Sequence, residues 1–282
     1  MRVDRRTRLA EIFRDTQQFY RTNRVLVEAL ENTKRRTLLY ETGKAPRFPS
    51  EKTRAGTISV TKFRTFEAAI RLTKENPGKR IAVLNFASAT NPGGGVVNGS
   101  SAQEECLCRC STLYPALNRA SLWEGYYSVN RAAGNVLHTD ACIYTPRIVI
   151  CKTDTDYPER MPQNEWVTVD VISCAAPNLR KLPNNQYNPE NGQAVVIPDK
   201  ELQRIHEQRA RAILAVAAEH GADILVLGAF GCGAFQNDPR VVAKAYAEVL
   251  KDCRRYFDLI EFAIYCRSFE TENYDVFKDE LA

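Results

Sequence analysis

The sequence predicts a three-layer α/β domain, because short apolar runs alternate along the chain with segments of helical periodicity. Residues 80–87 and 222–227 form runs long enough for buried parallel strands and too short for helices. Each run is followed by a glycine-rich loop and then by a helical pattern. In α/β sheets, ligands bind at loops of this kind, outside the carboxyl ends of the strands.

The remaining segments fit the same architecture. Further strands are expected at residues 56–60, 142–144, 148–151 and 166–173, the last of which is largely β-branched. Helices are expected at 65–75, at 103–117 and from about 199 to 220, where Gly221 provides a favoured stop. In the first thirty residues, apolar side chains recur at near-helical spacing, which indicates amphipathic helices that dock on the core.

The first glycine loop carries the strongest functional signal. Asn91-Pro92-Gly93-Gly94-Gly95 follows the first strand, and Gln103-Glu104-Glu105 begins the next expected helix. Three consecutive glycines allow backbone N–H groups to approach a ligand without interference from side chains. A loop that binds phosphate and places two acids at one end of its ligand suits chemistry on a phosphate-bearing sugar.

Two common nucleotide motifs do not fit this loop. A dinucleotide fingerprint needs a third glycine where Asn98 stands, and a Walker loop needs a Gly-Lys-Ser/Thr that is absent. A turn with chance glycines is the alternative.

The second glycine loop begins at Gly228 and runs through Phe230-Gly231-Cys232-Gly233-Ala234-Phe235. Asp238-Pro239 then supplies an N-cap and a proline suited to the first helical position. Two such loops on separate strands could hold a diphosphate from both sides. Either phenylalanine could pack on a ribose or a base, or under the loop.

Together, N-P-G-G-G, a seven-residue spacer, Q-E-E and the later G-A-F-G-C-G-x-F loop resemble the microbial-type poly(ADP-ribose) glycohydrolases. The resemblance covers residues 4–275 and implies a macrodomain, an α/β/α fold with a mixed central sheet that binds ADP-ribose. On this basis we expect residues 1–50 to form an N-terminal helical extension packed on the core, and 51–282 to form the macrodomain-like catalytic domain.

Cleaving a ribose–ribose bond passes through an oxocarbenium-like transition state and requires a proton for the leaving oxygen. Adjacent helical residues point about 100° apart, so the two glutamates must have different roles. The resemblance implies that Glu105 is the general acid and that Glu104 holds the ribose hydroxyls. It also implies that Asn91 orients the distal ribose and that Phe235 packs over it. The expected substrate-binding residues are Asn91, Gly93, Gly94, Gly95, Val96, Gln103, Gly231, Cys232, Gly233, Ala234 and Phe235.

Composition excludes other function classes. No apolar run reaches the ~18 residues of a membrane span, and no signal or transit peptide is expected. Nine cysteines without close pairing patterns predict reduced thiols in a cytoplasm. Cys106, Cys108 and Cys110 cannot all face one metal ion from a helix, so neither a metal nor a redox cofactor is expected. For Cys232 we expect the role of a small residue rather than a nucleophile.

The net charge of +5 belongs to the N-terminal segment, since residues 1–40 hold ten Lys/Arg and five Asp/Glu while the rest holds 29 of each. A solvated basic face and attraction to a polyanion both explain this surplus. The expected partners are poly(ADP-ribose) or ADP-ribose and ADP-ribosylated proteins, with nucleic acid not required, no membrane and a monomeric chain. Alternative functions are a non-hydrolytic ADP-ribose reader, a hydrolase of another ADP-ribose adduct, and a basic nucleic-acid-binding protein.

Two further regions invite prediction. The proline- and asparagine-rich stretch 176–198 either borders the adenosine site, with Tyr187 as a stacking partner, or is a plain surface excursion. We expect His206 and His220 on helix surfaces and His138 at a strand edge, none with a chemical role.

Overall fold

The computed structural model describes residues 4–50, 53–184 and 192–282. The described part of the chain forms a seven-stranded sheet in the order β1-β4-β5-β3-β6-β7-β2. The strands are β1 (Leu38–Tyr40), β2 (Thr57–Thr61), β3 (Ile81–Phe86), β4 (Cys142–Ile150), β5 (Val167–Cys174), β6 (Ile224–Leu227) and β7 (Leu259–Ala263). Strand β4 runs antiparallel to β1 and β5, and the other neighbours are parallel. The predicted three-layer α/β/α fold with a mixed sheet is confirmed.

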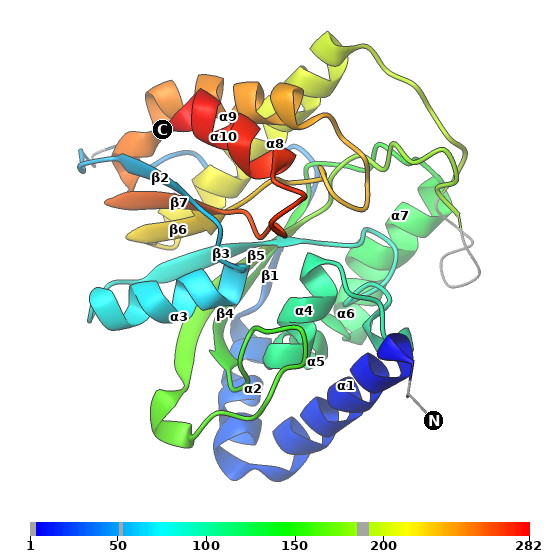
Figure 1. Cartoon of the computed structure of the whole chain (residues 1–282), viewed down its shortest axis with the longest axis vertical. Coiled ribbons are helices and arrows are strands. Elements are labelled where there is room, and N and C mark those ends of the chain that lie inside the picture. Colours follow the sequence, from blue (N-terminus) through cyan, green and yellow to red (C-terminus); the bar gives the residue numbers. More distant parts are fainter. Residues whose placement is uncertain (1–3, 51–52, 185–191) are drawn as a thin grey trace.

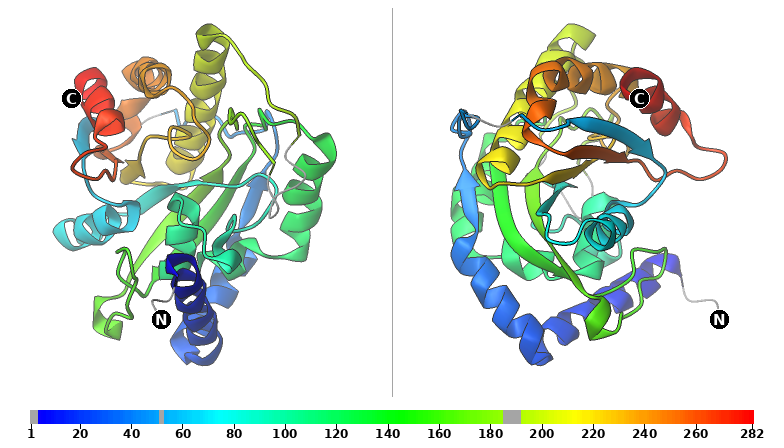
Figure 2. Two further views of the ribbon diagram at one scale, coloured as in Figure 1. Left: turned by 45° about the vertical axis from the view of Figure 1, so that its right-hand side comes forward. Right: turned by 90° about the vertical axis from the view of Figure 1, so that its left-hand side faces the viewer.

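Helices cover both faces of the sheet, with α8, α9 and α10 on one face and α1 to α5 on the other (Figures 1 and 2). Their bounds are α1 (Arg5–Thr22), α2 (Arg24–Arg36), α3 (Thr65–Glu75), α4 (Gln103–Cys110), α5 (Leu113–Leu117), α6 (Ala120–Leu122), α7 (Ser128–Ala133), α8 (Asp199–Glu219), α9 (Pro239–Cys253) and α10 (Glu272–Leu281). The side chains of β3 show why helices pack on both faces of the sheet. Ile81 and Val83 join the core under α1 to α5, whereas Ala82 and Leu84 join the core under α8 and α9.

The helix expected over 103–117 is divided in two. Helix α4 ends at Cys110, and Ser111 pairs with Ile150 at the end of β4. The N–H of Thr112 then donates to the carbonyl of Val149 (3.1 Å), so this backbone joins the sheet edge instead of continuing the helix. Pairing with a neighbouring strand therefore overrides helix propensity at this point.

The two strands expected around 142–151 form one strand, β4, with an irregularity between Thr145 and Ile148. Arg147 adopts a left-handed φ of +53° there, and its N–H donates to Oδ1 of Asp170 (2.9 Å). The sequence indicated two strands because Pro146 interrupts the strand pattern: proline has no N–H to donate to a neighbouring strand. A bulge at this proline lets the strand continue past it.

The N-terminal segment packs on the sheet and supports the loop that follows β3. It is not wholly helical, because β1 adds an antiparallel edge strand beside β4. On α1, the Thr16 hydroxyl donates to the carbonyl of Arg109 in α4 (2.7 Å). Arg6 reaches the loop itself and donates from Nε to the carbonyl of Asn98 (2.7 Å). No helix in the described ranges is both long and apolar enough to cross a membrane.

We expect Phe13→Ala to reduce the free energy of unfolding by about 3–5 kcal/mol, the range for removing a buried aromatic ring. Phe13 is 1% exposed and packs edge-on against Tyr114, with ring centroids 5.0 Å apart. The matched control is Phe269→Ala, because Phe269 is 76% exposed and should leave stability almost unchanged. Urea unfolding monitored by circular dichroism measures both. Equal, small losses would show that α1 is not an integral part of the folded unit.

Candidate active site

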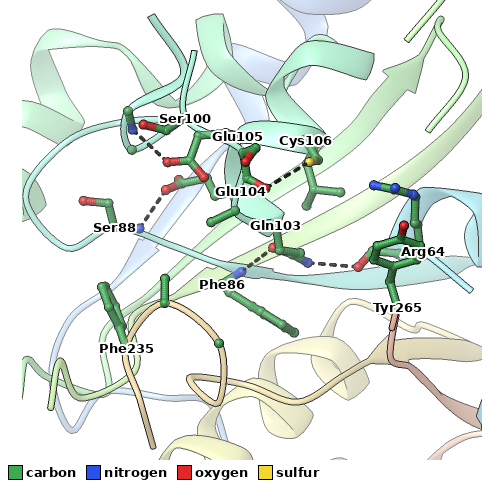
Figure 3. Close-up of a pocket in the computed structure, with 18 of the residues that line it drawn as sticks. Arg64, Phe86, Ser88, Ser100, Gln103, Glu104, Glu105, Cys106, Phe235 and Tyr265 are labelled. Atoms are coloured by element: carbon green, nitrogen blue, oxygen red, sulfur yellow. Dashed lines mark hydrogen bonds between the residues drawn. The ribbon is translucent and has the colours of Figure 1, made fainter. Parts of the chain in front are cut away.

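A cavity of about 830 Å³ opens where the loops after β3, β5, β6 and β7 meet the start of α4 and α1. This volume lies within the range of sites that enclose drug-sized ligands. Both adjacent glutamates of α4 line it, and so does Phe235 from the loop after β6 (Figure 3). The structure thus brings together two sequence motifs that lie more than a hundred residues apart.

Glu104 is held by three donors from the protein. Its Oε1 accepts from Nδ2 of Asn85 (3.2 Å) and from the N–H of Gly93 (3.2 Å), and its Oε2 accepts from the N–H of Ser88 (2.7 Å). The side chain is only 3% exposed. Burial, with the adjacent carboxyl of Glu105 as the second cause, raises the pKa of Glu104 to about 8 in spite of these donors.

Glu105 has fewer partners than its neighbour. Its Oε1 accepts from the N–H of Gly95 (2.9 Å), while its Oε2 is buried and has no hydrogen-bond partner among the described residues. Burial is the main cause that raises the pKa of Glu105, and the Gly95 N–H opposes it. It is unfavourable for two buried carboxyl groups this close to ionise together. The pair therefore keeps one proton at pH values above those at which a glutamate normally ionises.

The N–H groups of the first glycine loop donate to acceptors within the protein. The N–H groups of Gly93 and Gly95 donate to Glu104 and Glu105, and that of Gly94 donates to the carbonyl of Asn91 (3.0 Å). These N–H groups therefore donate within the protein, while Gly94 and Gly95 line the cavity. Contact of the three glycines with a diphosphate stays a prediction. The glycines are needed for close approach, since a Cβ on Gly94 would lie 2.6 Å from Oε1 of Glu105.

Gln103 lines the cavity, and its side-chain amide also makes three hydrogen bonds within the protein. Its Oε1 accepts from the N–H of Phe86 (2.9 Å), and its Nε2 donates to the carbonyl of Leu84 (2.8 Å) and the hydroxyl of Thr65 (3.1 Å). The amide is thus fully occupied in joining the first residue of α4 to the end of β3 (Figure 3). It positions the following two glutamates.

Two other expected binding residues do not reach the cavity. Val96 is completely buried and packs in the core beneath the loop. Asn91 turns its side-chain oxygen toward the guanidinium of Arg131 and does not line the cavity. A different asparagine contacts Glu104: Asn85, which lies one residue before the end of β3 and was not expected at the site because it stands in an apolar run.

The second glycine loop has the open donors that the first one lacks. Gly231, Gly233, Ala234 and Phe235 line the cavity, and their N–H groups meet no acceptor within the described ranges. Cys232 lies off the cavity and donates its N–H to the carbonyl of Ala229 (3.1 Å). Burial raises the pKa of its thiol, so it is a packed small residue and not a thiolate nucleophile.

Several cavity residues were not predicted. At one end, the Arg64 guanidinium lies over the ring of Tyr265, 3.8 Å from its centroid (Figure 3). At the other, His138 lies near Phe235 with ring centroids 6.1 Å apart, in a loop and not at a strand edge. No local sequence pattern predicts these residues, because they come from separate loops that meet only in the folded structure. Ala176 and Arg180 also line the cavity, but Tyr187 lies outside the described residues.

Comparison with known proteins decides the family. The profile described as "Microbial-type PARG, catalytic domain" matches residues 5–153. Poly(ADP-ribose) glycohydrolase from Deinococcus radiodurans, solved with ADP-ribose, is 34% identical, with a TM-score of 0.73 over 89% of this chain and 96% of that one. The chain belongs to the microbial-type PARG family.

A second solved structure agrees with this membership. The poly(ADP-ribose) glycohydrolase from Thermomonospora curvata, bound to the inhibitor ADP-HPD, is 28% identical, with a TM-score of 0.77 over 95% of this chain and 97% of that one. No curated protein matches the chain. The seven-stranded mixed sheet of this chain matches the macrodomain-like fold of these PARG structures.

The other titratable groups of this PARG-family chain do not form a second centre. In residues 4–50, 53–184 and 192–282, no three His, Cys, Asp or Glu side chains are placed to share a metal ion. His206 is buried at 1% exposure rather than on a helix surface, and His220 is half-buried against Tyr144, with the rings stacked 3.5 Å apart.

We expect Gly94→Ala to abolish activity, because its Cβ would displace the Glu105 carboxyl. Gly134→Ala is the matched control. Both glycines have a φ of +55°, so alanine meets the same backbone strain, but nothing lies within 4 Å of a Cβ on Gly134. Turnover measured beside thermal stability separates the two effects. Similar activity in both variants would contradict the need for close packing of loop and acid.

Glu105→Gln should also change how stability depends on pH. The pKa of Glu105 is raised in the folded protein, so the folded state holds this proton more tightly than the unfolded state does. The wild type therefore loses stability as pH rises from the usual pKa of glutamate to the raised pKa of Glu105. A neutral glutamine avoids this loss, which is about 1.4 kcal/mol per unit of raised pKa. Urea unfolding at pH 5 and pH 9 should therefore show a smaller alkaline loss in the variant. Parallel pH profiles would mean that Glu105 titrates normally.

Proposed function

We propose that this protein hydrolyses the ribose–ribose O-glycosidic bonds of poly(ADP-ribose) and releases ADP-ribose. The observation that carries the proposal is the buried Glu105, which has an unpartnered Oε2 and lines the same cavity as the open N–H groups of the second glycine loop. An acid held protonated beside an anion-binding loop suits cleavage of a sugar attached to a diphosphate. Family membership supports the same reaction.

We place the catalytic proton on Glu105. The pKa of Glu104, raised to about 8, by itself would also suit that residue as the acid. However, Glu104 uses three of its about four acceptor positions for protein donors, and a proton there would have to displace or weaken them. Glu105 accepts one hydrogen bond and has a second oxygen free. On this assignment the pair shares one proton, which lies on Glu105, and the three donors hold Glu104 ionised in spite of its raised pKa. Glu104 then has room for one substrate hydroxyl.

The cavity suggests how ADP-ribose lies. The diphosphate would accept from the N–H groups of Gly231, Gly233 and Ala234, as anions do at such loops. The distal ribose would then sit between Glu105 and the ring of Phe235. The adenosine would extend toward Tyr265 and Arg64 at the other end, where an aromatic face and a cation can pack on a base.

In this arrangement Glu105 donates its proton to the leaving ribose oxygen while the bond from that oxygen to the anomeric carbon breaks. The positive charge that develops on the distal ribose is stabilised by the ionised Glu104 beside it. A water molecule then adds to the anomeric carbon and returns a proton to Glu105. The products are ADP-ribose and a polymer shortened by one unit.

The setting we propose is a reducing, cytoplasmic one. All nine cysteines are free thiols, and six of them are buried. Chains that fold in oxidising compartments tend to pair their cysteines instead.

Glu105→Gln should reduce release of ADP-ribose from labelled poly(ADP-ribose) by about 10²–10⁴-fold, the usual contribution of a positioned acid. Calorimetric binding of free ADP-ribose should persist, because glutamine keeps the shape and the acceptor for Gly95. Glu201→Gln, at an exposed acid of α8, is the control and should retain activity. If the wild type binds ADP-ribose but leaves the polymer intact, the protein is a reader or a hydrolase of another adduct.

A further inference from the structure

The second glycine loop has a backbone that needs external support. Gly231 has a φ of +84° and Gln236 a φ of +58°, so the loop turns through the left-handed region twice. Glycine adopts this conformation freely, but a residue with a Cβ does so at a cost that the surroundings must offset. The open N–H groups that we propose for phosphate binding, those of Gly231, Gly233 and Ala234, belong to the segment that begins and ends at these two residues. Whatever fixes the loop at Gln236 therefore fixes the phosphate site.

Asn237 ties this loop together from behind. Its backbone N–H donates to the carbonyl of Gly231 (3.0 Å), which closes the loop on itself. Its side-chain Nδ2 donates to the carbonyl of Phe235 (3.1 Å) and to that of Pro177 in the loop after β5 (2.7 Å). The side chain is 2% exposed, so water does not compete for these bonds.

His206, on α8, in turn holds Asn237. Its Nε2 lies 2.7 Å from Oδ1 of Asn237, and the imidazole is 1% exposed. The same ring packs edge-on against Phe230, with centroids 5.7 Å apart and planes at 87°. One histidine thus contacts both the residue before Gly231 and the residue after Gln236, which are the two ends of the loop.

The hydrogen bonds determine which ring nitrogen of His206 carries the hydrogen. Since Nδ2 of Asn237 donates to two carbonyls, the amide must be oriented with Oδ1 toward the histidine. Oδ1 can only accept, so Nε2 of His206 carries the hydrogen and Nδ1, which has no partner among the described residues, does not. The imidazole is neutral and acts as a donor, which removes it from acid–base chemistry.

We propose that His206 is a positioning residue that, through Asn237, holds the loop Gly231–Asn237 in the conformation that binds the substrate diphosphate. The inference rests on the proposed function, because it concerns how that same site binds its ligand. His206 lies behind the loop and is absent from the cavity wall. Its effect should therefore appear in phosphate affinity and not in the chemical step, which depends on Glu105 on the other side of the cavity.

The test is calorimetric binding of ADP-ribose, ADP and adenosine to wild type, His206→Phe and His206→Gln. Phenylalanine keeps the ring edge against Phe230 and removes the N–H; glutamine offers an N–H at similar reach. We expect His206→Phe to raise Kd for ADP-ribose and ADP about tenfold, as for loss of a buried hydrogen bond, and to leave adenosine within about twofold. His206→Gln should restore most of the affinity. With polymer as substrate, KM should rise while kcat stays within about twofold.

Leu214→Ala, at a fully buried leucine two turns further along α8, is the matched control for stability. It should lower the melting temperature without weakening the binding of ADP-ribose and ADP more than that of adenosine. Equal losses for adenosine and ADP in His206→Phe, a loss matched by Leu214→Ala, or no loss at all would overturn the inference. A wild type that binds neither ADP nor ADP-ribose would overturn the proposed function itself, and the inference with it.

Discussion

The site depends on burying two adjacent carboxyl groups in the first turn of α4. Burial of charge is strongly unfavourable unless donors compensate it. Two of the four donors here are backbone N–H groups of a loop that only glycine can bring so close, and the others are the Asn85 amide and the Ser88 N–H. The compensation is unequal, since Glu104 accepts three hydrogen bonds and Glu105 one. In the proposed mechanism this inequality, rather than the identity of the residues, separates an ionised carboxylate from a protonated acid.

The remaining architecture supplies rigid walls for that pair. Gln103 joins the start of α4 to the end of β3, while α1 supports the same region through Thr16 and Arg6. Phe13 anchors α1 against the core. The basic N-terminal segment is thus part of the structure around the acids, which is one reason for its amphipathic pattern.

The two glycine loops look alike in sequence and act differently in the structure. The first one uses its N–H groups on the glutamates, and the second leaves several facing the cavity. The difference follows from what lies behind each loop. Acids on α4 lie within reach of Gly93 and Gly95, whereas the second loop is held at its ends by Asn237 and His206 and keeps its middle free.

The sequence by itself determined the alternation of strands and helices, the two loops and the acid pair, because these depend on local periodicity and on motifs within about fifteen residues. It also determined the resemblance to the family. Only the tertiary structure decided that the Gln103 amide bonds to β3, that Val96 is buried, that Asn85 contacts Glu104 and that His206 is buried. Tyr265, Arg64 and His138 reach the cavity from separate segments. Their placement follows from strand order and loop packing, which are long-range contacts that no local pattern encodes.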